Sequence, residues 1–400
     1  MQVARRMFSE RFNWEDSPTL FGKLLAEKRA SGKPIMDLTE SNPTRVGFHF
    51  EADAILSALS RPESLRYDSD PRGTPCARQA VTEYYKPLGQ RIDPDAVLLT
   101  AGTSEAYGFL FKLLSNPGDE ILVPAPGYPL LSYLARFEGL YCHSYPLRYA
   151  DDSGWSIDVE VLSALITPQS RAIIIVNPNN PTGSYIKTDE LAQIDSLCRR
   201  HNMALIVDEV FSDFEAVSVP GREKTVVTKT NALTFVLNGI SKTLGLPQMK
   251  LAWIIVGGDP HLANLAIDRL EALLDFYLSV STPVQHGLKR LLAGRFAIQQ
   301  QINARIIENS RFLKNQTDQT RNCRMLIREG GWYGIMEIRD GVLDDARALL
   351  MLEKEDTLIH PGFFYDFSRD GMVVLSLLPE PANFSQGVGR LLNRFAMSKG

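Results

Sequence analysis

The chain has 400 residues, 44% of them hydrophobic and 22% charged, and its formal net charge is -4. This length suits two domains, or one large domain with a smaller companion, and the composition is that of an ordinary globular protein. The sequence has no long basic run for nucleic acid, no apolar run that spans a bilayer and no secretory signal after its early arginines. Its four cysteines form neither a CxxC pair nor a zinc pattern, so we expect reduced thiols, no metal site and a cytoplasmic location: Cys76, Cys142, Cys198 and Cys323.

The middle of the chain alternates between strand-like and helix-like stretches. The run RAIIIV is rich in β-branched residues and apolar on both faces, as a buried parallel strand requires. Thr188 is the expected N-cap of the helix that follows. This alternation predicts an α/β domain with a mostly parallel sheet sandwiched by helices. The predicted strands cover residues 96–100, 120–123, 171–176, 203–208, 233–238 and 251–256, and the predicted helices cover 103–114, 129–137 and 188–201.

The character of the sequence changes near Pro260. A long helical stretch at 261–278 leads to Pro283, and shorter strands and helices follow it. This part predicts a smaller α+β domain. We therefore expect a large domain at residues 51–282, and a small domain made of residues 1–50 and 283–400 with an N-terminal arm. The later strands are predicted at 324–327, 334–338, 357–359 and 372–378, and the later helices at 343–354 and from about 384.

Ligands of open α/β sheets bind at the carboxyl ends of the strands, so we considered the residues that follow each predicted strand. After the first strand, AGTSEAY places Gly102, Thr103 and Ser104 at a helix N-terminus, which is a ready site for an anion. After the second strand, Tyr128 in APGYP lies just beyond two prolines, where its ring can be held flat over a ligand. An ordinary capped helix and a core aromatic are the alternative interpretations.

The segment NPNNPTG at 177–183 follows the third strand and is more specific. Asn180 can donate a hydrogen bond to a ligand oxygen, and the Asn180–Pro181 bond is a candidate cis peptide. Asp208 ends the next strand, where a buried carboxylate needs a cation or hydrogen-bond donors. A surface turn and a solvent-facing strand end are the alternatives.

Ser241 and Lys242 follow the strand TFVLNGI. A lysine beside a buried strand can have a lowered pKa and act as a nucleophile toward carbonyls, although most lysines are simply solvated. Lys250 precedes the next apolar strand and can supply a second positive charge to a phosphate. Each of these motifs is weak alone, but their order at successive strand ends is informative.

This succession resembles the class I/II aminotransferases of fold type I, which depend on pyridoxal 5'-phosphate (PLP). The closest matches are NPNNPTG, the DEVF strand end and SKTLGLPQMKLAW. The resemblance implies a PLP-transferase fold in which Lys242 holds the cofactor as a Schiff base and moves the substrate proton. It further implies that Asp208 keeps the ring nitrogen protonated. Asn180 is implied to bind the phenolic oxygen, and Tyr128 to stack on the ring.

The remaining cofactor contacts are implied by the same resemblance. Gly102, Thr103 and Ser104 would hold the phosphate with Ser241 nearby, and Lys250 stands where many relatives carry arginine. Tyr67, in RYDSDPRG, matches a tyrosine that reaches the phosphate of a neighbouring subunit, which implies a homodimer with shared active sites. Ser41 and Asn42, in ESNPTR, match the loop at the edge of the substrate pocket.

Three positions depart from the family pattern. Phe211 replaces a tyrosine that also touches the phenolic oxygen, so the pKa of the lysine–cofactor link should rise. Gly239 stands where relatives often carry serine. Val374, in MVVLSLL, occupies the position of the arginine that grips the substrate carboxylate, and valine cannot replace a guanidinium.

Another cation must therefore bind the carboxylate, or the substrate is not held as an ordinary α-amino acid. Arg45 and Arg369 are the nearest candidates, and His360 in HPGFFYDF is a weaker one. A surface charge is the alternative for each arginine. Tyr333 belongs to an aromatic cluster that is expected to be mostly core, although part of it can line the pocket and favour an apolar substrate.

The predicted function is a ping-pong transfer of an amino group between an amino acid or amine and a 2-oxo acid, both small molecules. One alternative is a different PLP reaction on the same fold, such as β- or γ-elimination, replacement, decarboxylation or cyclisation. The other is a PLP-binding regulator, which usually carries a DNA-binding domain. The first 40 residues are too few for such a domain.

Overall fold

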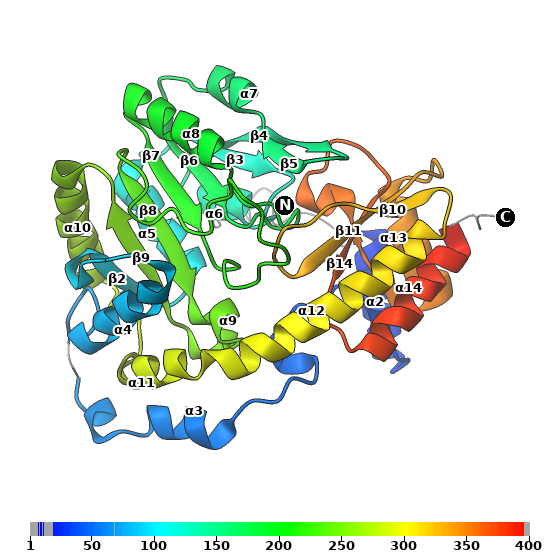
Figure 1. Ribbon diagram of the computed structural model, residues 1–400, viewed down its shortest axis with the longest axis horizontal. Coiled ribbons are helices and arrows are strands. Elements are labelled where there is room, and N and C mark those ends of the chain that lie inside the picture. The colour runs from blue at the N-terminus through cyan, green and yellow to red at the C-terminus, as the bar shows by residue number, and fades with distance from the viewer. Residues whose placement is uncertain (1–6, 8, 10, 12–18, 68, 396–400) are drawn as a thin grey trace.

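The structure is a computed structural model that describes residues 7, 9, 11, 19–67 and 69–395, so most of the predicted N-terminal arm lies outside it. The strands of these residues form sheets of eight, four and two strands. The eight-stranded sheet and its helices make one part of the molecule, and the four-stranded sheet lies in the other part (Figure 1). This arrangement confirms the predicted fold class, a large α/β part with a smaller α+β part.

The eight-stranded sheet has the strand order β2-β9-β8-β7-β6-β3-β4-β5. Four of its seven strand pairings are parallel, so the sheet is mostly parallel as predicted. The exceptions are β9, which runs antiparallel to both neighbours, and the edge strand β5. The bounds are β2 Val97–Thr100, β3 Glu120–Ala125, β4 Tyr141–Ala150, β5 Gly154–Ile157, β6 Ser170–Val176, β7 Ala204–Asp208, β8 Thr234–Gly239 and β9 Ala252–Gly257.

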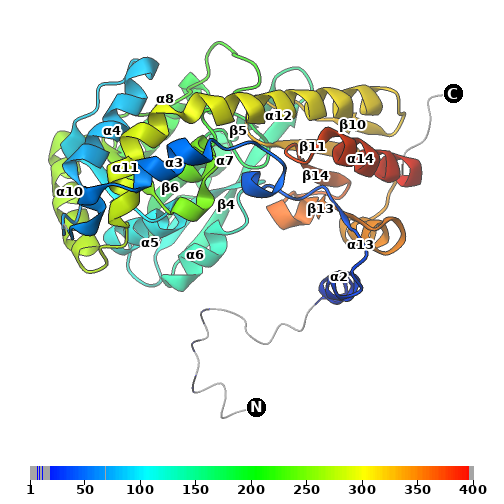
Figure 2. The same ribbon diagram turned by 90° about the horizontal axis from the view of Figure 1, so that it is seen from below.

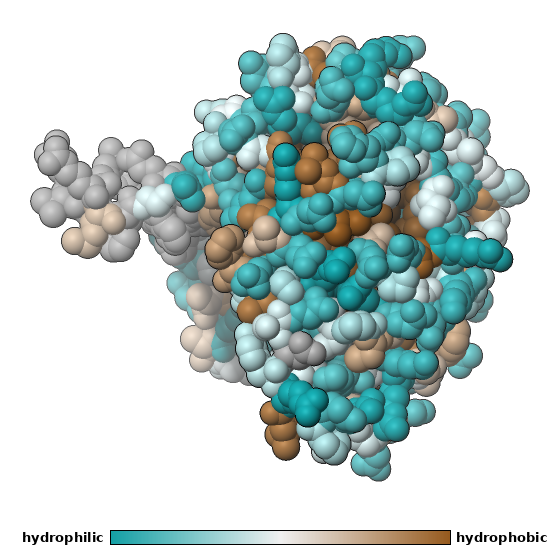
Figure 3. Space-filling model, turned by 90° about the vertical axis from the view of Figure 1, so that its left-hand side faces the viewer, coloured by the Kyte–Doolittle hydropathy of each residue, from teal (hydrophilic) through white to brown (hydrophobic). Residues whose placement is uncertain are grey.

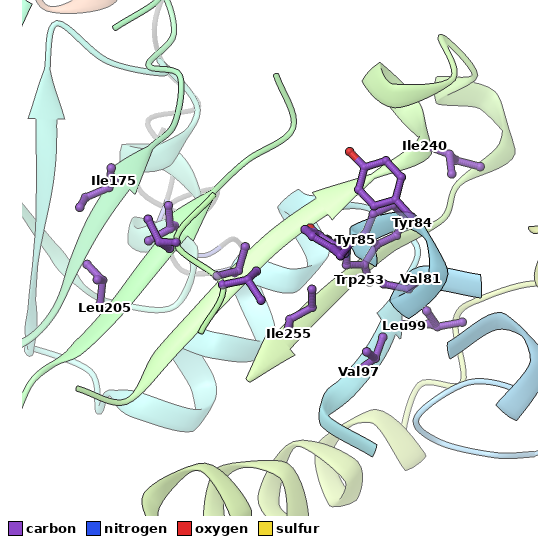
Figure 4. Close-up of a cluster of buried hydrophobic side chains, with 14 of the residues drawn as sticks. Val81, Tyr84, Tyr85, Val97, Leu99, Ile175, Leu205, Ile240, Trp253 and Ile255 are labelled. Atoms are coloured by element: carbon purple, nitrogen blue, oxygen red, sulfur yellow. Dashed lines mark hydrogen bonds between the residues drawn. The ribbon is translucent and has the colours of Figure 1, made fainter. Parts of the chain in front are cut away.

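Helices cover both faces of this sheet, because alternate residues of the buried strands point to opposite sides. In β6, Ile173 and Ile175 pack into one core cluster and Ile174 packs into the other. Figure 4 shows the first cluster, in which rings from the helix α4 lie against Trp253 of β9. The helices of this part are α3 Ala52–Leu59, α4 Pro75–Tyr85, α5 Thr103–Leu114, α6 Leu131–Phe137, α7 Val159–Ala164, α8 Thr188–His201, α9 Ile240–Thr243, α10 Pro260–Asp275 and α11 Thr282–Ala293.

Two features of this part differ from the sequence analysis. The N-cap of α8 is Lys187 and not Thr188. Its backbone N–H donates to Glu190 Oε2 at 2.9 Å, while the Thr188 hydroxyl donates to Glu223 Oε1 at 2.8 Å. Because the distant Glu223 takes the Thr188 hydroxyl, this hydroxyl does not cap the helix, and the N-cap lies one residue earlier than expected. The second feature is the β4–β5 hairpin, which the sequence analysis did not predict.

The smaller part is built on an antiparallel sheet of order β10-β11-β14-β13. A second, parallel pair joins β1, near the start of the chain, to β12. This pairing brings the N-terminal segment beside the C-terminal third of the chain. The strands are β1 Met36–Asp37, β10 Cys323–Met325, β11 Tyr333–Ile338, β12 Thr357–Leu358, β13 His360–Pro361 and β14 Met372–Ser376, and the helices are α2 Leu20–Ala30, α13 Asp344–Glu355 and α14 Pro381–Phe395.

The helix α12 (Arg295–Asp318) has 24 residues and runs from one part to the other (Figures 1 and 2). Near its start, Gln299 Nε2 donates to Asp213 Oδ2 at 2.9 Å and to the carbonyl oxygen of Thr243 at 3.0 Å. The preceding helix α11 buries Leu288 in the core of the large part. We therefore propose that the domain boundary predicted after residue 282 falls later, within α12. None of the helices in the described ranges is long and apolar enough to cross a membrane.

Candidate active site

A cavity of about 230 Å³ lies where the carboxyl ends of the central strands meet. Val176, Asp208 and Gly239 line it from the last residues of β6, β7 and β8. Thr103 and Tyr128 reach it from the segments after β2 and β3. The candidates taken from separate strand ends therefore share one cavity. Its full lining is Ser41, Thr103, Tyr128, Val176, Asn180, Asp208, Val210, Phe211, Gly239, Ser241, Lys242, Ala252 and Tyr333.

Lys242 lies on α9, directly after β8, and its amine is surrounded by rings. The Nζ atom is 5.1 Å from the ring centroid of Trp332 and 5.8 Å from that of Phe211. Burial lowers the pKa of this amine, and the negative charge of Asp208 opposes the shift. A lysine with a lowered pKa has a larger neutral fraction, and the neutral amine is the nucleophile toward carbonyls.

Asp208 supplies the opposite charge in the same cavity. Its Oδ1 accepts from the backbone N–H of Val210 at 3.1 Å, and its Oδ2 accepts from the hydroxyl of Tyr107 at 3.2 Å. Burial raises the pKa of Asp208 to about 6, while these two hydrogen bonds and Lys242 work in the other direction. At neutral pH the group is therefore mostly a buried carboxylate, which suits a cationic ligand atom.

One end of the cavity is suited to an anion. Thr103 and Ser104 begin the 12-residue helix α5, and no side chain caps its N-terminus. A Cβ atom added to Gly102 would lie 3.3 Å from Lys250 Nζ, so the glycine leaves room for the ammonium beside these N–H groups. Free N–H groups at a helix N-terminus together with a lysine make a phosphate site.

The polar residues between these two ends are held by the turn after β6. The Asn180–Pro181 peptide is cis, as the sequence suggested, and so are Ala125–Pro126 and Asn177–Pro178. Asn180 is buried and its Oδ1 has no hydrogen-bond partner among the described residues. The Tyr128 hydroxyl hydrogen-bonds Ser104, and burial raises its pKa to about 12, so it stays a neutral phenol. An unsatisfied buried acceptor such as this Oδ1 is costly unless a hydrogen-bond donor meets it.

A family model described as aminotransferase class I and II matches residues 33–371. The chain belongs to this family. It is 29% identical over 290 residues to the glutamate-pyruvate aminotransferase AlaA of Haemophilus influenzae, which covers 71% of this chain and 69% of the relative. It is 27% identical over 385 residues to the alanine aminotransferase of Mycobacterium tuberculosis, which covers 92% of this chain and 87% of the relative.

Solved structures have the same fold. An aminotransferase from Escherichia coli superposes with a TM-score of 0.85 at 25% identity and covers 97% of this chain and 98% of that one. The alanine aminotransferase of Pyrococcus furiosus superposes with a TM-score of 0.86 at 23% identity, over 97% of this chain and 99% of that one. The protein is thus an aminotransferase whose cofactor is PLP.

The cavity of this aminotransferase fits that cofactor. PLP carries a phosphate, a phenolic oxygen, a ring nitrogen and an aldehyde. The cavity offers a helix N-terminus with a lysine for the phosphate and the Asn180 amide, whose Nδ2 can donate to the phenolic oxygen. It also offers a buried carboxylate for the ring nitrogen and a partly buried amine with a lowered pKa for the aldehyde. The residues present therefore fit the four polar features of the cofactor.

Two of the family departures have local explanations in this aminotransferase. The Phe211 ring meets Trp332 edge to face at a centroid distance of 5.3 Å, so the position belongs to an apolar wall beside Lys242. A Cβ atom added to Gly239 would lie 2.8 Å from the Cβ of Ala252. The close approach of β9 thus excludes a side chain at residue 239.

The substrate-side residues are only partly brought together. Ser41 and Tyr333 line the cavity, and the Tyr333 hydroxyl hydrogen-bonds Ser41 and Tyr365. His360 Nδ1 lies 3.0 Å from the Tyr365 hydroxyl. Burial lowers the pKa of His360 to about 4, so its ring is neutral at neutral pH. His360 thus belongs to a chain of neutral polar groups that ends at the cavity.

The two arginines proposed as carboxylate partners lie elsewhere. Arg45 has 74% of its side chain exposed, faces Glu40 at 4.0 Å and lines a different cavity. Arg369 is 56% exposed and pairs with Glu337 at 2.8 Å. Val374 is buried in an apolar cluster. The placement of these three residues gives no support to either arginine as the carboxylate partner.

Three further residues do not line the cavity: Asn42, Tyr67 and Tyr107. Asn42 lies outside the cavity lining, where its Oδ1 accepts from the N–H of Thr44 at 3.0 Å. Tyr67 is 75% exposed. Tyr107 was missed by the sequence analysis, although it follows Thr103 by four residues and so lies on the same face of α5. That spacing was the available signal for a residue that contacts Asp208.

Proposed function

We propose that the cavity at the ends of β6, β7 and β8 is the catalytic site of this aminotransferase, with Lys242 as its reactive amine. The observation that carries the proposal is the pairing of Lys242 and Asp208 in one cavity, with the amine beside two rings and the carboxylate held by two hydrogen bonds. Bound PLP would supply an aldehyde that joins the amino group of the substrate. Its protonated ring would withdraw electrons from the carbon that bears this amino group.

The residues of the chain would divide the work as follows. Lys242 Nζ would hold the cofactor, and its free amine would carry the proton to and from the substrate carbon. Asp208 would pair with the positive charge of the ring nitrogen. Lys250 and the N-terminus of α5 would bind the phosphate with Ser104, while Asn180 Nδ2 would donate to the phenolic oxygen. Phe211 and Trp332 restrict water around Nζ.

The same proposal includes the assembly and location of the enzyme. We infer a homodimer in which Tyr67 reaches the partner's phosphate, because an exposed tyrosine beside Leu65, which is 93% exposed, is unusual for a surface facing water. Further apolar side chains, Phe276 and Tyr277, are exposed just after α10, and Figure 3 shows apolar surface on the side where α10 lies. The four unpaired cysteines suit a cytoplasmic location.

The names of the relatives suggest which amino donors to test. Relatives are named for alanine and for glutamate and pyruvate. We propose these compounds as the first substrates to test. The cavity has an aromatic lining and the neutral Tyr333–Tyr365–His360 chain, where a guanidinium would carry a positive charge. We therefore expect it to bind a substrate carboxylate more weakly than an arginine would.

The test is an absorbance titration of the purified protein with PLP and a panel of amino acids and amines, one at a time. A donor that converts the visible band of the lysine-bound cofactor to the amine form, with recovery on adding a 2-oxo acid, supports the proposal. Lys242→Ala must abolish the band. A variant that keeps the band would show that another lysine is used, and an unresponsive band with every donor would favour a different reaction. Sedimentation of the wild type and of Tyr67→Ala tests the dimer separately.

A further inference from the structure

Tyr107 is fully buried on α5, four residues after Thr103. Its hydroxyl donates to Asp208 Oδ2 at 3.2 Å across 101 residues of sequence. Its ring lies 5.8 Å from that of Phe111, on the same helix. One helix therefore presents its N-terminus to the phosphate end of the cavity and a phenol to the carboxylate.

The other charged and titratable groups around Asp208 come from three elements. Lys242 on α9 attracts the carboxylate without a hydrogen bond to it, Tyr128 approaches after β3, and Glu209 follows on the same chain segment. Burial raises the pKa of Glu209 to about 8, so it is mostly neutral at pH 7. Within the described ranges, the Tyr107 hydroxyl is thus the one side chain that donates a hydrogen bond to Asp208.

We propose that Tyr107 is the positioning residue of Asp208, and that its hydroxyl keeps this carboxylate ionised and fixed and so sets how tightly the cofactor is held. The inference rests on the proposed role of Asp208 as the partner of the ring nitrogen. Tyr107 does not line the cavity, so it acts through Asp208 and touches neither substrate nor cofactor.

The physical consequence is a change in proton balance. A hydrogen bond to a carboxylate favours its charged form, so Tyr107→Phe should raise the pKa of Asp208 above its value of about 6. Pairing with a protonated ring nitrogen requires an ionised Asp208, so any proton on this carboxyl must leave when the cofactor binds. At pH 7 Asp208 is ionised in about 0.9 of the wild-type molecules and, with a pKa one unit higher, in about 0.5, so the net proton uptake on binding should fall by about 0.4 proton.

The experiment is calorimetric titration of the full-length protein, freed of cofactor, with PLP at pH 7 in two buffers of different ionisation enthalpy. This yields both the dissociation constant and the proton uptake. The matched control is Tyr145→Phe, which also removes one buried hydroxyl, a donor to the carbonyl oxygen of Ile174 at 2.7 Å. Asp208→Asn, with and without Tyr107→Phe, completes a double-mutant cycle.

We expect Tyr107→Phe to weaken PLP binding by about 10-fold or more and to lower the proton uptake, as loss of a hydrogen bond to a charged group implies. Tyr145→Phe should change neither quantity, and Tyr107→Phe should add little in the Asp208→Asn background. Equal behaviour of the two tyrosine variants, or full additivity in the cycle, would overturn the role of Tyr107. An Asp208→Asn variant with unchanged affinity and uptake would instead overturn the role of Asp208, and the inference with it.

Discussion

Replacement of Glu209 should change how the stability of the protein depends on pH. The Glu209 side chain is fully buried, and its carboxyl oxygens meet the N–H of Val226 at 2.7 Å and the hydroxyl of Thr225 at 2.8 Å. Burial is the largest cause that raises its pKa from 4.5 to about 8, and the neighbouring Asp208 adds to the rise. Glu209 is therefore a protonated acid in the folded protein at neutral pH and an ionised one in the unfolded chain.

The sign and size of the effect follow from proton binding. Between pH 4.5 and pH 8 the folded state holds a proton that the unfolded state has lost, so stability falls as pH rises. Each pKa unit corresponds to about 1.4 kcal/mol, which gives a total of about 5 kcal/mol. Between about pH 6 and about pH 9, the loss assigned to Glu209 is about 2–3 kcal/mol.

Glu209→Gln removes this titration and keeps the shape of the side chain. The amide oxygen can accept from Val226, and the Thr225 hydroxyl can rotate to accept from the amide N–H. The measurement is the free energy of unfolding in urea at about pH 6 and pH 9 for the cofactor-free wild type and variant. We expect the variant to lose about 2–3 kcal/mol less than the wild type over this range. The exposed Glu160→Gln is the control, and parallel profiles for wild type and Glu209→Gln would refute the reasoning.

Three further predictions concern the site and the smaller part. Lys242→Ala should lower activity by about 10²–10⁴-fold or more in steady-state assays with unchanged circular dichroism, and substantial residual turnover would contradict its role. Gly239→Ser should destabilise the protein by about 1–3 kcal/mol in urea unfolding because Ala252 blocks the new side chain, and a neutral effect would contradict this. Ala252→Gly should relieve part of that cost. Arg347 is buried and pairs with Asp340 at 2.7 and 2.8 Å, so Arg347→Met should cost about 3–5 kcal/mol. The pair lowers the pKa of Asp340, so its contribution is present at neutral pH and lost as pH falls through that pKa, which urea unfolding at acidic pH will detect.

The strands of the large sheet and the residues at their ends were predictable because both signals are local. Buried parallel strands are continuous apolar runs, and the polar residues that follow them stand out against this background. Lys242, Asp208 and Asn180 were therefore found from sequence, and the structure places all three in one cavity. The β4–β5 hairpin was missed because the segment at 141–150 mixes polar and apolar residues without a clear period.

Contacts between distant parts of the chain were not predictable in the same way. Arg45 and Arg369 follow suggestive motifs, but each pairs with a carboxylate and neither lines the cavity. From sequence, Tyr107 is expected to be an apolar residue on one face of a helix. Its hydroxyl contacts Asp208 only because β7 brings that residue beside α5. The helix α12 likewise joins two cores that no local pattern connects.

The contacts of Gln299 attach the start of α12 to the segment that carries Lys242. The same amide nitrogen ties the helix to Asp213 and to the backbone of Thr243, the residue after Lys242. A tilt of α12 as one rigid helix would therefore strain both hydrogen bonds. The short segment that carries Lys242 is thus tied to the first turns of a helix that reaches the other part of the molecule (Figure 2).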